Sequence, residues 1–235
     1  MTELDTTPTV FHRRRFLAGS LAAGGVLALP ACAGGFGGGF SFTDAIARLL
    51  MLSTGRAFDR MTAPGGFWDQ QVASIGLDGM LGARGGVLNR ILTSGLFKDR
   101  MARALAPVAF DAAQRAAPVV ADTIRVVGFQ NAIDLVRGGP TAATSFLRQE
   151  MGTRLIDAMI PGVGQGLRLA SDPLVGEALG ALTGVDIPQV ARNFSGRVED
   201  VIWGEIGREE SFIRANPQAT RDPLIIGVFG SARAL

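Results

Sequence analysis

The sequence contains no tyrosine, a single histidine and a single cysteine among its 235 residues. The histidine, His12, and the cysteine, Cys32, belong to an N-terminal segment with the pattern of an export signal. The rest of the chain therefore lacks the side chains for a Ser/His/Asp triad, a Cys/His nucleophile, a histidine general base or a Cys/His zinc site. No catalytic residue, metal site or cofactor is predicted, and enzymatic activity, although open, is disfavoured.

The N-terminal segment has the basic start and apolar middle of a signal peptide. Its Arg-Arg-x-Phe-Leu motif is formed by Arg13, Arg14, Phe16 and Leu17. The apolar stretch that follows covers about half of the ~20 residues needed to cross a bilayer, which is typical of a secretory signal. The motif resembles a twin-arginine signal. An ordinary Sec signal with an arginine-rich start is the alternative.

Two processing sites overlap at the end of this segment. Leu29 to Cys32 resembles a lipobox, which predicts cleavage before Cys32 and lipidation of its thiol. Ala31 to Ala33 is also an Ala-x-Ala site, and cleavage after Ala33 would release a soluble periplasmic protein. A glycine-rich run follows Cys32, as expected for a flexible tether. We therefore expect a lipoprotein on the periplasmic face of a membrane, and Ala33 after the cysteine favours the outer membrane.

The chain divides into an export signal over residues 1–31, a tether over 32–41 and one domain over 42–235. Apolar residues in this domain recur at three- and four-residue spacings, and alternating strand patterns are hard to find, so the fold class is all-α. The charges nearly balance, so no nucleic-acid partner is predicted. The lone cysteine excludes disulfide bonds within the chain.

Turn and capping residues predict where the first helices begin and end. Ser41 or Thr43 is expected to cap the first helix. Two later helices are expected over 98–116 and 119–127, each with a proline that marks a kink or a first turn. A short helix over 131–137 would end at a glycine pair in the manner of a C-cap.

Further helices are expected in the C-terminal half. One starts at Pro140 and breaks near Pro161, and the glycines of 162–166 are expected to form a helix-to-helix turn. Short helices, one opened by Asp172, precede a long helix that starts near Asp186 and ends at Asn216 before a proline. The tail from Leu224 to Phe229 is expected to fold back onto the core.

Motifs in the C-terminal half resemble those of a bacterial domain-of-unknown-function family, number 4197. The motif residues are Gly138-Gly139-Pro140, Ala142-Ala143-Thr144, Phe146, Arg148, Pro161, Glu209-Glu210, Ile213-Arg214, Asn216-Pro217 and Val228-Phe229-Gly230. The resemblance covers about residues 131–230 by its motifs and extends back to Val72 by pattern and length. It implies a secreted or envelope-associated α-helical domain with a signal peptide and no established catalytic residue or ligand. The glycine-rich segment 76–86 and Cys32 depart from the usual family pattern.

The densest polar cluster of the domain lies near the end of the last long helix. Its candidate binding residues are Arg148, Glu209, Glu210, Arg214 and Asn216. Glu210 and Arg214 are four residues apart and can pair on one helical face, as in an ordinary solvated helix end. Alternatively, Arg148 and Arg214 recognise an anionic group that a glutamate orients.

Two function classes follow from these residues. The first is a non-catalytic envelope protein that is anchored to the membrane by its lipid and binds an envelope protein or an amphiphilic ligand. The alternative is a carboxylate-dependent envelope hydrolase, in which Asp157 or Glu150 acts with Glu209 across a cleft. The composition favours the first class.

Overall fold

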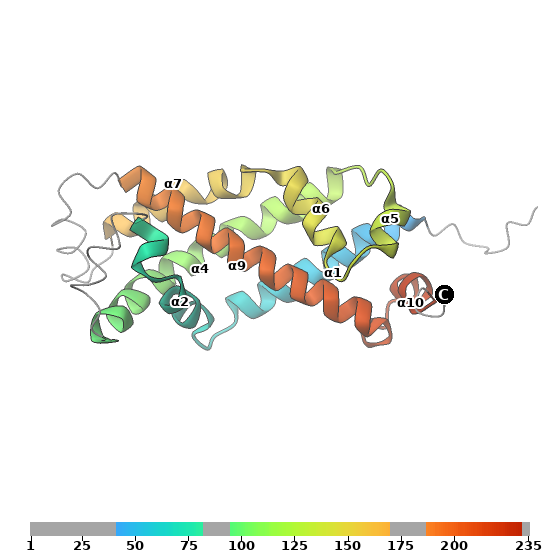
Figure 1. Ribbon diagram of the computed structural model, residues 1–235, viewed down its shortest axis with the longest axis horizontal. Coiled ribbons are helices and arrows are strands. Elements are labelled where there is room, and N and C mark those ends of the chain that lie inside the picture. Colours follow the sequence, from blue (N-terminus) through green and yellow to red (C-terminus); the bar gives the residue numbers. More distant parts are fainter. Residues whose placement is uncertain (1–40, 82–94, 170–186, 232–235) are drawn as a thin grey trace, which may run out of the picture. The chain divides into compact units, whose positions relative to one another are not determined.

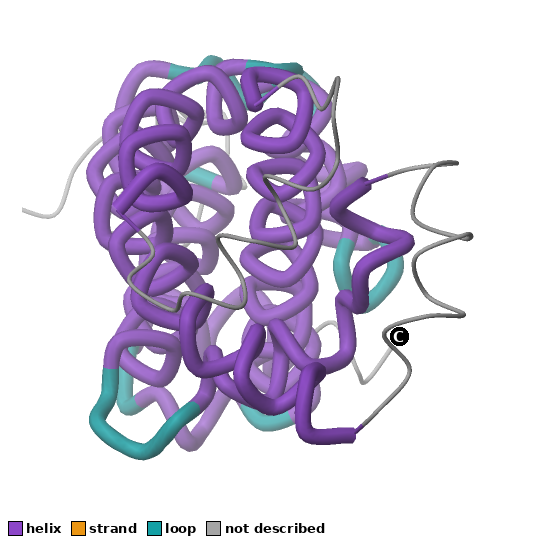
Figure 2. The backbone as a smooth tube through the Cα atoms, turned by 90° about the vertical axis from the view of Figure 1, so that its left-hand side faces the viewer, coloured by secondary structure: helices purple, strands orange, loops and turns teal. Residues whose placement is uncertain are grey.

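The computed structural model describes residues 41–81, 95–169 and 187–231, and every regular element in these ranges is helical (Figures 1 and 2). The elements are α1 (Phe42–Thr62), α2 (Phe67–Leu81), α4 (Gly95–Val126), α5 (Ala132–Arg137), α6 (Ala142–Met151), α7 (Arg154–Leu169), α9 (Ile187–Ala215), a 3-10 turn η2 (Pro217–Thr220) and α10 (Pro223–Ser231). The all-α prediction is confirmed. The predicted features at Cys32, at Asp172, at Asp186 and in the export motif lie outside the described residues.

Four helices form the centre of the fold. α4 packs on α7, α7 on α9, α9 on α1 and α1 on α4, and neighbouring helices in this ring run in opposite directions (Figure 1). α2 covers α4 and α9. The core between them is filled by fully buried apolar side chains, which include Leu49, Leu155, Phe194 and Ile206. Burial of such side chains is the main stabilising term of a helical bundle.

The first helix starts as the sequence predicts. Ser41 is its N-cap, and the Ser41 Oγ accepts a hydrogen bond of 3.0 Å from the backbone N–H of Asp44. The Asp44 carboxylate accepts one in return from the Ser41 N–H, which completes a capping box.

The prediction of two helices over 98–116 and 119–127 is wrong, because α4 continues through both prolines. Pro107 and Pro118 are both exposed. Their rings and the carbonyls that lose a backbone partner thus lie on the outer face of the helix, where water can hydrogen-bond to those carbonyls. The inner face, with Leu105 and Ala109, stays packed in the core. This burial offsets a local cost of about 3 kcal/mol for each proline.

The expected break at Pro161 is also wrong. The chain breaks at Gly152, which has a φ of 54° and ends α6, whereas Pro161 is exposed within α7. Only glycine adopts such an angle at little cost. The Gly138 C-cap of α5 is different: its φ is −66°, but a Cβ there would lie 2.6 Å from the Ala142 Cβ. Close packing rather than a left-handed turn requires glycine at this position.

The glycines of 162–166 lie inside α7 and form no turn, which corrects the prediction. A Cβ on Gly162 would lie 2.7 Å from the Arg115 side chain, and a Cβ on Gly166 would lie 2.9 Å from the Val108 side chain. Both neighbours belong to α4. The two glycines are four residues apart on one helical face and allow α7 to approach α4 closely.

The predicted end of the long helix is confirmed, since α9 stops at Ala215 before Asn216 and Pro217. α10 then packs back, with Ile225 and Phe229 buried. Asp222 begins this helix and accepts backbone hydrogen bonds from Leu224 and Ile225 as well as a 2.6 Å bond from Arg48 of α1. Burial alone would raise the pKa of Asp222, but the Arg48 guanidinium and the two N–H donors outweigh it and hold that pKa below its usual value.

Candidate functional site

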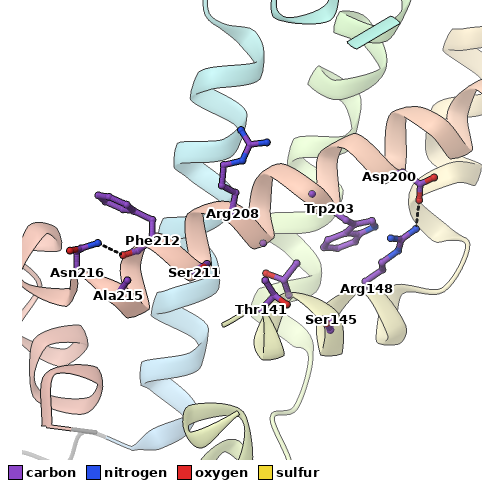
Figure 3. Close-up of a pocket in the computed structure, with 13 residues that line it drawn as sticks. Thr141, Ser145, Arg148, Asp200, Trp203, Arg208, Ser211, Phe212, Ala215 and Asn216 are labelled. Atoms are coloured by element: carbon purple, nitrogen blue, oxygen red, sulfur yellow. Dashed lines mark hydrogen bonds and ion pairs between the residues drawn. The ribbon is translucent and has the colours of Figure 1, made fainter. Parts of the chain in front are cut away.

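The candidate site is a groove of 610 Å³ between α6 and the C-terminal half of α9 (Figure 3). It is lined by Thr141, Thr144, Ser145 and Arg148 on the α6 side and by Asp200, Trp203, Gly204, Gly207, Arg208, Ser211, Phe212, Ala215 and Asn216 on the α9 side. Its lining combines hydroxyl and amide groups with the rings of Trp203 and Phe212. A mixed lining of this kind suits an amphiphilic ligand or a peptide segment.

The groove depends on two glycines of α9, Gly204 and Gly207, which have no side chains to fill it. Gly204 has nothing within 4 Å of the place where a Cβ would lie, so this part of the groove is open. Gly207 is different, since a Cβ there would lie 3.2 Å from Thr141 Cγ2. Gly207 therefore allows α6 to approach α9, and Gly204 leaves space beside the contact.

Charged side chains gather at one end of the groove. Arg148 donates hydrogen bonds to Asp200 at 2.6 Å and to Glu199 at 3.4 Å, and Figure 3 shows its side chain pointing toward Asp200. The Trp203 indole N–H donates to the other oxygen of Glu199 at 3.1 Å. Trp203 is thus held by a buried carboxylate, which fixes the wall of the groove.

One polar atom beside the groove is unsatisfied. The Thr144 Oγ1 is buried and has no hydrogen-bond partner among the described residues. Most buried polar groups in proteins are paired. Thr144 lies in the α6 wall next to exposed Ser145, whose hydroxyl is the accessible one of the two.

Glu210 and Arg214 form a clamp behind the groove that ties four helices together. Glu210 is fully buried and accepts hydrogen bonds from the backbone N–H groups of Ala143 and Thr144, at 3.0 and 2.7 Å. These are N–H groups in the first turn of α6, which have no partner within their own helix. Glu210 also accepts from Arg214 Nε at 2.8 Å, so this carboxylate caps α6 from a different helix.

Arg214 uses the rest of its guanidinium on α5 and α10. Nη1 and Nη2 donate to the backbone carbonyls of Val136 and Leu135 at 3.0 and 2.9 Å, and the guanidinium lies over the Phe229 ring, 4.9 Å from its centroid. The three nitrogens of Arg214 therefore all have partners inside the fold, and the ring contact adds a cation–π term.

A second arginine network lies where α9 faces α1. Arg60 of α1 donates to Glu205 at 2.7 Å and forms an ion pair with Glu209, while Arg208 pairs with Glu205 at 2.8 Å. Both glutamates are nearly completely buried. A buried carboxylate needs a partner of opposite charge, and here each one has it.

The candidate cluster predicted from sequence is divided between the groove and the fold. Arg148 and Asn216 line the groove, where the Asn216 side chain donates to the Phe212 carbonyl at 3.2 Å. Glu209, Glu210 and Arg214 do not line it. Because the three nitrogens of Arg214 are already occupied, its guanidinium and that of Arg148 do not converge on one open site.

Of the carboxylate pairs in the hydrolase hypothesis, Asp157 and Glu209 are separated. Asp157 of α7 lies 3.9 Å from Arg192 near the start of α9. Glu209 is more than four turns farther along the same helix, roughly 25 Å away. Glu150 is exposed near the end of α6. Within the described ranges, no group of three or more His, Cys, Asp or Glu side chains is placed to hold a metal ion.

Sequence reasoning missed most of the groove lining, including Ser145, Trp203, Ser211 and Phe212. The spacing of Gly204, Gly207 and Ser211 in the sequence indicates this groove, because small residues three and four apart lie on one helical face and leave space there. Phe212 beside this stripe is 49% exposed, which is uncommon for a large apolar side chain in a well-packed domain.

Comparison with known proteins identifies the family. Residues 39–230 match the model of a family described as a protein of unknown function, DUF4197, so the chain belongs to this family and the resemblance of its C-terminal motifs is confirmed. No curated protein and no solved structure matches the chain significantly. None of the helices in the ranges given above is long and apolar enough to span a membrane.

Proposed function

We propose that this DUF4197 protein is an exported, lipid-anchored, non-catalytic binding protein, which holds a segment of an envelope partner in the groove between α6 and α9. The observation that carries the proposal is the groove itself, with the exposed ring of Phe212, the Arg148–Asp200 pair and neutral hydroxyl groups along one surface. A partner segment with alternating apolar and polar groups would match this lining.

The use of the glutamates on α9 supports a binding role over a catalytic one. Glu199 is engaged by Arg148 and Trp203, Glu205 and Glu209 by Arg60, and Glu210 by Arg214. A general acid or base needs a carboxylate that can exchange a proton with a substrate. These four buried acids instead fix the positions of helices.

The export motif and Cys32 support the location in this proposal. The twin-arginine-like motif directs export, and acylation of Cys32 followed by the glycine-rich run would leave the helical domain tethered on the periplasmic side of the outer membrane. Intact-mass spectrometry of the membrane-purified protein should find a chain that begins at Cys32 and carries acyl mass, and Cys32→Ser should abolish it. An unacylated chain starting at Gly34 in the periplasm would contradict the anchor.

Binding in the groove is tested by photo-crosslinking in cells. A benzoylphenylalanine at Ser211, which lines the groove, should give one discrete adduct, identified by mass spectrometry. The same residue at Gln114, exposed on α4 and outside the groove, serves as the control. Identical adducts at the two positions, or no adduct at Ser211, would contradict a specific partner in the groove.

A further inference from the structure

Exposed large apolar side chains are few in the described residues and are not evenly distributed. They are Phe42, Val126, Ile133 and Phe212, which are 47%, 80%, 39% and 49% exposed. Phe212 lines the groove. The other three have no place in the groove or the core, so their exposure needs a separate explanation.

The fold brings these three side chains to one end of the bundle. Phe42 is the first residue of α1 and Val126 is the last residue of α4, and these two helices pack side by side in opposite directions. Ile133 lies in the first turn of α5, which follows α4 after a short loop and packs on α1. Figure 1 shows the start of α1, the end of α4 and all of α5 on the same side. We call the surface of Phe42, Val126 and Ile133 the apolar end.

Neighbouring residues show that this exposure is specific to the three positions. Ile124, Phe129 and Val136 in the same segments are buried, so the core already has its apolar side chains there. Charges of both signs lie nearby: Arg125 pairs with Asp122 at 2.8 Å, and Asp44, Asp134 and Arg137 lie in the same segments. The apolar end thus offers hydrophobic contact, and the charges beside it are of both signs.

We propose that the apolar end rests on the lipid bilayer, with Phe42, Val126 and Ile133 at the boundary between headgroups and acyl chains. This inference rests on the membrane anchor of the proposed function. The helical domain starts about nine residues after Cys32, so an acylated cysteine holds the start of α1 within ~30 Å of the lipid. Tethering raises the effective concentration of the surface at the apolar end, so three side chains suffice where they would bind weakly in solution.

The experiment places a tryptophan on each of two matched phenylalanines. The chain from Cys32 onward, as Phe42→Trp or Phe212→Trp, is coupled through its only cysteine to a maleimide lipid in phosphatidylcholine vesicles, with or without bromine on the acyl chains near the glycerol. After the emission of the unchanged chain is subtracted, the emission of the added tryptophan in Phe42→Trp should fall by about half in bromolipid vesicles, because interfacial side chains lie ~5–10 Å into the headgroup boundary. Emission from Phe212→Trp should stay unchanged, and Trp68 and Trp203 give both variants the same background.

Two further results decide the inference. Equal quenching of the two variants, or none in either, would overturn it. Replacing part of the phosphatidylcholine by phosphatidylglycerol should leave the quenching of Phe42→Trp unchanged, and a strong increase would show electrostatic rather than apolar contact. Coupling through a maleimide makes this test independent of natural acylation, so a missing acyl group in cells would contradict the anchor alone.

Discussion

The C-terminal half of α9 has two sides that use polar residues in opposite ways. Where α9 faces its neighbouring helices, Glu205, Glu209 and Glu210 are buried and Arg214 is only 10% exposed, and these residues are joined to α1, α5, α6 and α10. On the other side Gly204, Ser211 and Phe212 face an open groove. The buried charges are committed to the fold, whereas the groove, whose lining includes Asp200 and Arg208 of α9, is open to a ligand. A dense charged motif is thus a weaker guide to a binding site than the partners of each charge.

The largest effect is expected from removing the clamp. Glu210→Ala leaves Arg214 without its carboxylate and exposes two N–H groups of α6 without a cap. Loss of one partner of a buried ion pair costs about 3–5 kcal/mol. Urea unfolding of the chain from Cys32 onward should show this loss.

Glu150→Ala, at an exposed position on α6, is the control for this substitution. It should change the free energy of unfolding by no more than about 0.5 kcal/mol. A loss below about 1 kcal/mol for Glu210→Ala would mean that the clamp side of α9 is not the one that stabilises the fold.

A smaller effect, dependent on pH, is expected at Asp222. Since the pKa of Asp222 is lowered in the folded state, its ionised form contributes stability above the unfolded-state pKa, and this contribution is lost as the pH falls through the folded-state pKa. Asn can keep the bonds to the backbone N–H groups but not the ion pair with Arg48, so Asp222→Asn should be less stable than the unchanged chain at pH 7, by up to about 1 kcal/mol, with a difference that disappears toward pH 2. Urea unfolding at several pH values measures this. A difference that grows toward low pH would have the wrong sign.

Sequence patterns predicted those parts of the fold that depend on local chemistry. Ser41 with Asp44 caps α1, and Pro217 ends α9, because side-chain caps and proline act within a few residues. The predicted helix boundary at Pro118 and the predicted break at Pro161 were wrong, whereas Pro107 lies inside a helix as predicted. Each of these prolines is on the outer face of its helix, and that position depends on the packing of the opposite face. The predicted turn at Gly166 was wrong for a related reason, because this glycine makes room for Val108 of another helix.

The candidate site was predicted only in part. Arg148 and Asn216 line the groove, as predicted. The sequence could not show that the Arg214 guanidinium donates its hydrogen bonds to the carbonyls of Leu135 and Val136, nearly eighty residues earlier in the chain. Pairing of Glu210 with Arg214 was predictable from their spacing of four. Their joint role as a cap for α6 was not, because it requires the placement of α6 against α9.

The most direct test fills the groove with a larger side chain and leaves Glu210 and Arg214 of the clamp unchanged. Gly204→Gln adds a side chain where nothing lies within 4 Å, and Gly196→Gln does the same on α9 outside the groove. We expect the free energy of unfolding of both variants to stay within about 1 kcal/mol of that of the unchanged chain. The replaced glycine itself costs about that much relative to a good helix former. Gly204→Gln should abolish the Ser211 crosslink, and Gly196→Gln should keep it. A crosslink that persists at full yield in Gly204→Gln would contradict the assignment of the groove as the binding site.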